Sequence, residues 1–83
     1  MQQKPRRVRF AICLAAKPDE DLLAGRVYRV LPDPSAAEAG CLRVVDESGE
    51  DYLYAAKRFV ILEIPEKARG RLLKAVTSGG ERE

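Results

Sequence analysis

Few residues in this chain are suited to chemistry, and their types argue against catalysis. The 83 residues include no histidine, so the usual general base near neutral pH is absent and neither a Ser-His-Asp nor a Cys-His arrangement can form. The two cysteines, Cys13 and Cys41, are not in a CxxC pair and supply at most half of a zinc site. No phosphate-binding glycine motif or EF-hand spacing occurs. We therefore predict a protein that is not an enzyme, with reduced cysteines and with no metal or cofactor.

Carboxylates are concentrated in two short segments, residues 19–21 and 46–51. Their acidic residues are Asp19, Glu20, Asp21, Asp46, Glu47, Glu50 and Asp51. Because ionised carboxylates are not buried without partners, both segments are expected to be solvated loops. Either segment can also pair with the arginines of a partner protein. The sequence alone leaves both interpretations open.

Three aromatic residues, Tyr52, Tyr54 and Phe59, follow the second acidic segment. If Leu53 and Val60 face the core, strand alternation turns the three rings outwards, where they form an apolar patch. Either a C-terminal helix or a partner protein then covers this patch. The apolar side chains that the helix offers for this purpose are Leu72, Leu73 and Val76.

The hydrophobic pattern predicts a mainly β protein. The expected strands cover residues 7–15, 26–31, 41–46, 51–55 and 59–64. In the first strand, the period of two predicts that Val8, Phe10, Ile12 and Leu14 face the core, with Arg9, Ala11 and Cys13 on the other side. In the second strand, Tyr28 and Val30 are expected to point inwards, and in the last strand Val60, Leu62 and Ile64.

Turn and helix signals separate these strands. Asp33 as a cap, Pro34 at the first helical position and Gly40 past the end predict a short helix after the second strand. Ser48 and Gly49 predict a tight hairpin, and "AKR" at 56–58 predicts a single helical turn. Apolar spacing predicts a C-terminal helix over 65–77. Residues 1–6 are expected to be a flexible basic leader, and residues 78–83 a flexible tail.

Composition and charge set the class of protein. Apolar residues make up 46% of the chain and charged residues 34%, with a net charge of +2, which indicates a single globular domain. The longest apolar run, "FAICLAA", is far shorter than the roughly 20 residues that span a bilayer, so no membrane association is expected. Without a signal peptide or a disulfide pattern, the expected location is the cytoplasm.

Three stretches in order resemble the SH3 fold in its broad sense, which includes many bacterial SH3-like barrels. "FAICLAA" is similar to the opening strand, "PDEDLLAGRVYRVL" to the acidic loop and diverging strand, and "YLYAAKRFV" to the strand, 3₁₀ turn and final strand. The segments "G.VYRV.PD" and "LRV.DESGEDYLY" also resemble small bacterial proteins. The resemblance implies a small five-stranded SH3-like barrel over 7–64, with a short inserted helix and a C-terminal helix.

The polyproline-binding features of SH3 domains are altered in this chain. SH3 domains bind proline-rich ligands on aromatic ridges, and this chain has no tryptophan. Ala55 stands where a proline is usual, Phe59 where a tyrosine is usual, and Cys41 and Leu42 where tryptophans are usual. Because a fold does not carry its function with it, we do not expect polyproline binding.

The sequence supports two hypotheses of function, which belong to different classes. The leading hypothesis is a non-enzymatic SH3-like protein-interaction module or accessory subunit that binds a protein or peptide. Its expected partner-binding residues are Asp19, Glu20, Asp21, Tyr54 and Phe59. The alternative is a nucleic-acid or ribosome-associated small β-barrel that contacts phosphates. Its expected contacts are Lys4, Arg6, Arg7, Arg9, Lys67, Arg71 and Lys74. The small net charge and the two acidic segments argue against the alternative.

Overall fold

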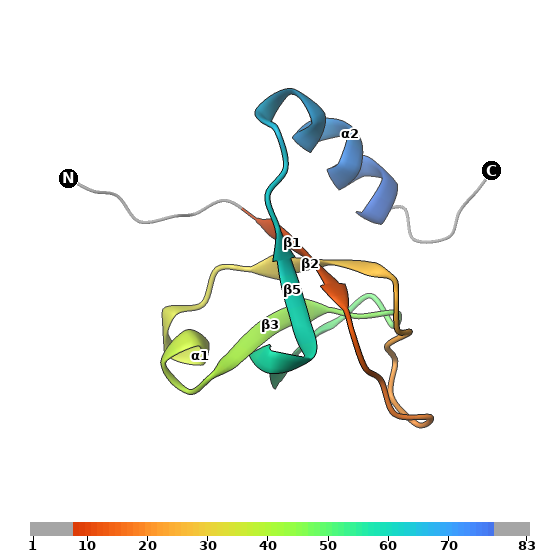
Figure 1. Ribbon diagram of the computed structural model, residues 1–83, viewed down its shortest axis with the longest axis vertical. Coiled ribbons are helices and arrows are strands. Elements are labelled where there is room, and N and C mark those ends of the chain that lie inside the picture. Colours follow the sequence, from red (N-terminus) through yellow and green to blue (C-terminus); the bar gives the residue numbers. More distant parts are fainter. Residues whose placement is uncertain (1–7, 78–83) are drawn as a thin grey trace.

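One antiparallel sheet and two α-helices make up the computed structural model, which describes residues 8–77 (Figure 1). The strands are β1 (Arg9–Cys13), β2 (Val27–Leu31), β3 (Cys41–Val45), β4 (Asp51–Ala55) and β5 (Phe59–Leu62). The helices are α1 (Pro34–Glu38), the 3₁₀ helix η1 (Ala56–Arg58) and α2 (Glu66–Thr77). The predicted mainly β fold with an inserted and a C-terminal helix is confirmed. The expected leader (1–6) and tail (78–83) lie outside the described residues.

The strand order in the sheet is β4-β3-β2-β1-β5, with every neighbouring pair antiparallel. Among the described residues, β4 and β5 are therefore the two edges, and no pairing between them closes the sheet. The helix η1 connects these edges. The Ala56 amide donates to the Gly40 carbonyl at 2.9 Å, and the Leu14 amide donates to the Arg58 carbonyl at 2.8 Å.

The expected caps and turns are present. The Asp33 side chain accepts a hydrogen bond from the Ala36 amide at 3.1 Å, and Pro34 opens α1, as the sequence predicts. In the β3–β4 hairpin, Gly49 has a φ of 89°, the left-handed region in which glycine carries no steric cost. The Asp46 side chain accepts from the Ser48 amide at 2.9 Å and fixes the same turn.

The main core lies on one face of the sheet. Its buried members are Ala11, Cys13, Leu22, Tyr28, Val30, Val44 and Phe59, and Ala16, Leu42, Tyr54 and Ile61 pack against them. The expectation that Tyr28 and Val30 point inwards is confirmed. Cys13 and Cys41 are both free thiols, the first buried and the second partly buried.

The predicted orientation of β1 is wrong. Ala11 and Cys13, expected to face away, are in the main core, whereas Phe10 is buried on the opposite face and Leu14 is exposed. The cause is α2, which covers that opposite face beside β2 (Figure 1). Because both faces of β1 are covered, apolar side chains occur on both, and alternation alone does not identify the main core.

The predicted orientation of β4 and β5 is also wrong. Leu53 and Val60, expected in the core, are 48% and 46% exposed, whereas Phe59 is only 7% exposed. Phe59 pairs with Cys13 across β1 and β5, and directly opposed residues share a face of the sheet. This register places the Phe59 ring in the core with Cys13.

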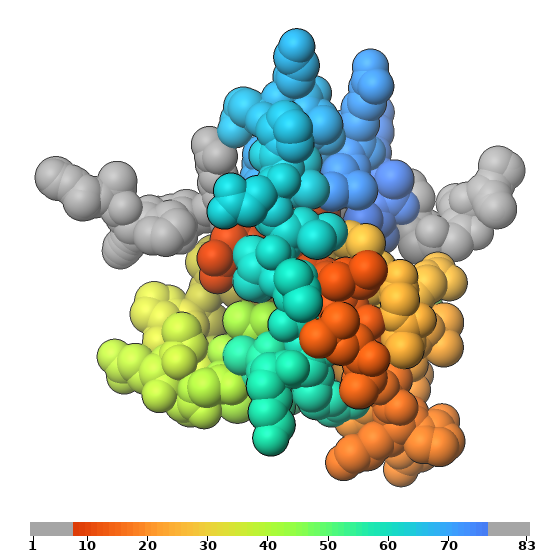
Figure 2. Space-filling view, viewed as in Figure 1, coloured from red at the N-terminus to blue at the C-terminus, as the bar shows by residue number. Residues whose placement is uncertain are grey.

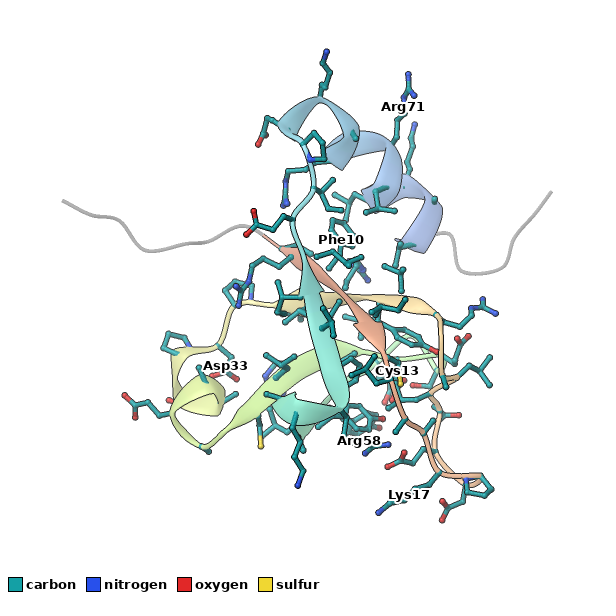
Figure 3. The ribbon with its side chains drawn as sticks, in the orientation of Figure 1. Phe10, Cys13, Lys17, Asp33, Arg58 and Arg71 are labelled. Carbon is teal, nitrogen blue, oxygen red and sulfur yellow. The ribbon has the colours of Figure 1, made fainter. Side chains whose placement is uncertain are left out.

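Helix α2 packs on the sheet, although not over the rings of Tyr52, Tyr54 and Phe59. The Arg69 guanidinium lies 5.8 Å from the centre of the Phe10 ring and also donates to the Val8 carbonyl. Leu72 and Val76 are partly buried, but Leu73 is exposed. Figure 3 shows Phe10 on the side of β1 that faces α2. The helix therefore covers Phe10 rather than Tyr52, Tyr54 and Phe59.

Candidate functional site

The two acidic segments meet in space. The Glu47 amide, in the β3–β4 hairpin, donates to the Asp21 carbonyl at 2.8 Å. Tyr28 strengthens this junction, since its hydroxyl accepts from the Leu23 amide at 2.8 Å and donates to the Glu47 carboxylate at 2.5 Å. Burial and the bond to Glu47 raise the pKa of Tyr28, so the hydroxyl stays protonated and able to donate. The acidic loop and the hairpin are thereby held as one surface.

This acidic surface comprises Asp19, Asp21, Glu47, Glu50 and Tyr52. Its members are exposed, and the Tyr52 side chain donates to the Glu50 carboxylate at 2.8 Å. The hydrogen bond to Glu50 is the main cause that raises the pKa of Tyr52, and the charge of Asp21 adds to the shift. In residues 8–77, the side chains of Asp19 and Asp21 form no hydrogen bond or ion pair. They are therefore available to a cationic partner.

Glu20, in contrast, is committed to an internal ion pair. Both terminal nitrogens of Arg58 donate to its carboxylate, one of them at 3.0 Å, and the Lys17 amide donates at 3.0 Å. The bonds from Arg58 and then Lys17 lower the pKa of Glu20 to about 2. Arg58 also donates to the Ala15 carbonyl at 3.0 Å. The pair fixes the acidic loop to η1, and Figure 3 shows Arg58 on the side of the molecule that carries Lys17.

Tyr54 and Phe59 lie next to this ion pair, and neither ring is an exposed surface on which a partner could stack. The ring centres are 6.2 Å apart, and the Arg58 guanidinium lies 5.8 Å from the centre of the Tyr54 ring. The Tyr54 hydroxyl donates to buried Asp46 at 2.7 Å, and burial followed by this bond raises the pKa of Tyr54. Phe59 is in the core. The structure thus brings Glu20, Tyr54 and Phe59 together as a support beneath the surface.

Tyr52 and Leu53, on β4, are the exposed apolar residues that sequence reasoning did not place at the site. Tyr52 is 50% exposed and Leu53 is 48% exposed. Their exposure follows from the position of β4 at the edge of the sheet, which depends on the pairing of all five strands. The exposure of Tyr52 agrees with the outward orientation that strand alternation predicts. For Leu53, which was expected in the core, the signal in the sequence is the absence of proline and lysine from Asp51–Ala55.

Of the residues expected to bind nucleic acid, those that the structure describes lie at the other end of the molecule. Lys4, Arg6 and Arg7 are outside the described residues, and Arg9 is exposed at the start of β1. The α2 cations Lys67, Arg71 and Lys74 are exposed and, with spacings of four and three residues, share a helix face. Figure 3 shows Arg71 pointing away from the sheet, and Figure 2 shows α2 at the end opposite the acidic loop. The basic and acidic surfaces are therefore separate.

A cleft of about 380 Å³ lies between the end of α2 and the start of β2. It is lined by Ala75 and Val76 on one side and by Arg26, Tyr28 and Glu47 on the other. Three of its polar side chains are paired, because Glu47 accepts from Tyr28 and Arg26 lies 3.8 Å from the Glu47 carboxylate, which leaves Arg29 as a separate cation in the lining. The cleft therefore presents no converging set of free polar groups.

Metal-ligand geometry is absent from residues 8–77, in which no three cysteine or carboxylate side chains are grouped to hold an ion. The same residues contain no helix of the length and hydropathy needed to cross a membrane. Comparisons with protein-family models, with curated proteins and with solved structures give no significant match to the chain. The case for a function rests on the geometry and charge of the described residues.

Proposed function

We propose that this chain is a non-enzymatic protein-interaction module with the architecture of a small SH3-like barrel. The strand order β4-β3-β2-β1-β5 and the 3₁₀ helix between β4 and β5 support this architecture. The sequence resemblance covers the same elements, from the first strand to the last. The accessory-subunit role belongs to this proposal, because the exposed features of residues 8–77 are suited to binding.

The observation that carries the proposal is the 2.8 Å bond from the Glu47 amide to the Asp21 carbonyl. It joins two acidic segments that are 26 residues apart in the chain, counted from position 21 to position 47. Carboxylates from both segments then surround the half-exposed Tyr52. A surface held in place before binding loses less conformational entropy when a partner docks.

The partner that fits this surface is a basic peptide segment with arginine as its main contact. A guanidinium can donate two hydrogen bonds to a carboxylate and can also stack on the Tyr52 ring. The binding residues in this proposal are Asp19, Asp21, Glu50 and Tyr52, beside Glu47, whose carboxylate already accepts a hydrogen bond from Tyr28. Glu20, Tyr54 and Phe59 support this surface without contacting the partner. The Glu20 carboxylate is bonded to Arg58, the Tyr54 hydroxyl is bonded to Asp46, and Phe59 is buried in the core.

Titration with an arginine-containing peptide tests the proposal, with amide chemical shifts and calorimetry as measurements. We expect shifts at Asp19, Asp21, Glu50 and Tyr52, and an affinity at least fivefold weaker in the Asp21→Asn/Glu50→Gln variant. The matched control is Glu38→Gln/Glu63→Gln, which removes the same charge from exposed positions elsewhere. Equal losses in the two variants would show only a nonspecific charge effect and would contradict the proposed site.

Nucleic-acid binding is the second candidate, and the shared face of Lys67, Arg71 and Lys74 on α2 favours it. Phosphate neutralisation releases counterions, so affinity for nucleic acid falls steeply with salt. A gel-shift assay at two salt concentrations, with Lys67→Gln/Arg71→Gln as the variant, tests this candidate. Salt-sensitive binding that this variant weakens, with no peptide binding at Tyr52, would select the second candidate over the first.

A further inference from the structure

We propose that two copies of this chain associate through β4, which pairs with the β4 of the second copy in antiparallel fashion and extends the sheet across the dimer. Within residues 8–77, strand β4 is at one end of the sheet and pairs with β3 alone. Alternate backbone amides and carbonyls of an edge strand point away from its neighbour and can bond to another strand. The inference does not rest on the proposed peptide site, although the two surfaces share Tyr52.

The sequence of β4 lacks the features that protect edge strands. Proteins commonly place lysine, proline or a bulge on an exposed edge to prevent pairing, and Asp51–Ala55 contains neither lysine nor proline. Its five residues pair with β3 without interruption, so there is no bulge. Its one charged side chain, Asp51, accepts a hydrogen bond from Arg43 of β3 at 3.0 Å. Tyr52 and Leu53 are left half-exposed.

The antiparallel register centred on Leu53 is self-complementary. It places Leu53 opposite the second copy's Leu53, and Tyr52 opposite the second copy's Tyr54 on both sides of the two-fold axis. Aromatic pairs directly across two strands are favourable. Asp51 then lies opposite Ala55, so no like charges oppose each other. This register uses all five residues of each strand.

Opposite charges at the two ends of the paired β4 strands support a second copy of this chain as the partner. In the register centred on Leu53, Asp51 of one copy lies opposite Ala55 of the second copy, and the long side chain of Lys57, two residues further along, can extend towards it. Lys57 is exposed in η1, immediately after β4. Two such pairs form by symmetry. The acidic hairpins lie at opposite ends of the ribbon, so their charges stay apart.

The other edge, β5, is less suited to the same role. It has four residues, against five in β4. Pairing of β4 with a β5 edge would be head-to-tail and would build open chains rather than a closed dimer. The β4–β4 pairing closes with two-fold symmetry and uses the longer of the two edge strands.

Sedimentation velocity of the full chain over a range of concentrations tests the dimer. We expect the mass to rise from 9.2 kDa towards twice that value. Leu53→Lys should abolish the dimer, whereas Val60→Lys, at a residue of similar exposure on β5, should leave it unchanged. Circular dichroism checks that both variants fold. A chain that stays monomeric at all concentrations, or a dimer that Val60→Lys removes and Leu53→Lys does not, overturns the proposal.

The register has its own test. In a mixture of isotope-labelled and unlabelled chains, filtered nuclear Overhauser effects should connect Tyr52 of one copy with Tyr54 of the other. Lys57→Glu should weaken association at least threefold, because it sets an acid beside Asp51. If Overhauser effects at β4 instead arise only after a basic peptide is added to a monomeric chain, the edge receives a partner's strand, and the dimer is wrong.

Discussion

The Arg58 guanidinium donates hydrogen bonds to the carboxylate of Glu20, a residue 38 positions earlier in the chain. The side chains are mostly shielded from solvent, with 17% and 20% of their surfaces exposed. Because Arg58 precedes β5 and Glu20 lies between β1 and β2, the pair holds a long loop against the edge of the sheet. The proposed acidic surface depends on this loop position, since Asp21 follows Glu20 directly.

This ion pair predicts a pH-dependent contribution to stability. The pKa of Glu20 falls from 4.5 to about 2 in the folded chain, so its stabilisation is fully present above pH 4.5 and is lost as the pH falls towards 2. Glu20→Gln should therefore lower the urea midpoint at pH 7, and most of the difference should disappear at pH 2. Asp19→Asn, at an exposed residue of the same loop, is the control and should have little effect. A Glu20→Gln deficit that persists at pH 2 contradicts this role.

The sequence was sufficient to predict which segments form elements, because each boundary has a local chemical cause. Asp33 and Pro34 start α1, Gly49 permits the hairpin turn, and the "AKR" turn coincides with η1. The assignment of faces failed at Phe10 and Phe59. The face of the sheet on which a side chain is buried depends on what covers each face. Here α2 covers Phe10, and the β1–β5 register places Phe59 beside Cys13; both are contacts between residues far apart in the chain.

The candidate site was predictable in part for the same reason. The sequence indicated two acidic segments and a nearby aromatic group, and the structure brings them together. It gave no means of knowing that Arg58 occupies Glu20 or that Phe59 is buried, because both facts arise from long-range packing. Tyr52 and Leu53 are exposed only because β4 has a neighbour on one side.

Substitutions at adjacent positions of β5 test the corrected facing. Phe59→Ala should cost about 3 to 5 kcal/mol of unfolding free energy, because it removes a buried ring and leaves a cavity. Val60→Ala, at an exposed position, should cost less than about 1 kcal/mol. Urea denaturation at low protein concentration gives both values. If Phe59→Ala does not fold, Phe59→Leu, which retains an apolar side chain, should still cost more than Val60→Ala; the reverse order would reject the facing.

A pair of leucines tests how α2 packs on the sheet. Leu72 is partly buried and Leu73 is exposed, so Leu72→Ala should cost about 1 to 2 kcal/mol and Leu73→Ala about half of that or less. Thermal unfolding followed by circular dichroism measures both changes. Equal small losses, together with rapid amide exchange throughout α2, would show that the helix does not rest on the Phe10 face.

Two glycines should respond to alanine in opposite directions, because the same methyl group meets different backbone conformations. Gly70 is an exposed residue inside α2 with no atom within 4 Å of an added Cβ, so Gly70→Ala should stabilise the chain by about 0.5 to 1 kcal/mol through higher helix propensity. Gly25 also has open space, but its φ is 88°, and Gly25→Ala should cost about 1 to 2 kcal/mol of backbone strain.

Urea denaturation of the two variants measures these values. The Gly25 amide donates to the Cys13 carbonyl at 2.7 Å, so the destabilised variant should also exchange this amide faster. Destabilisation by Gly70→Ala would mean that α2 needs backbone freedom at that position and is not the continuous helix that docks beside β2.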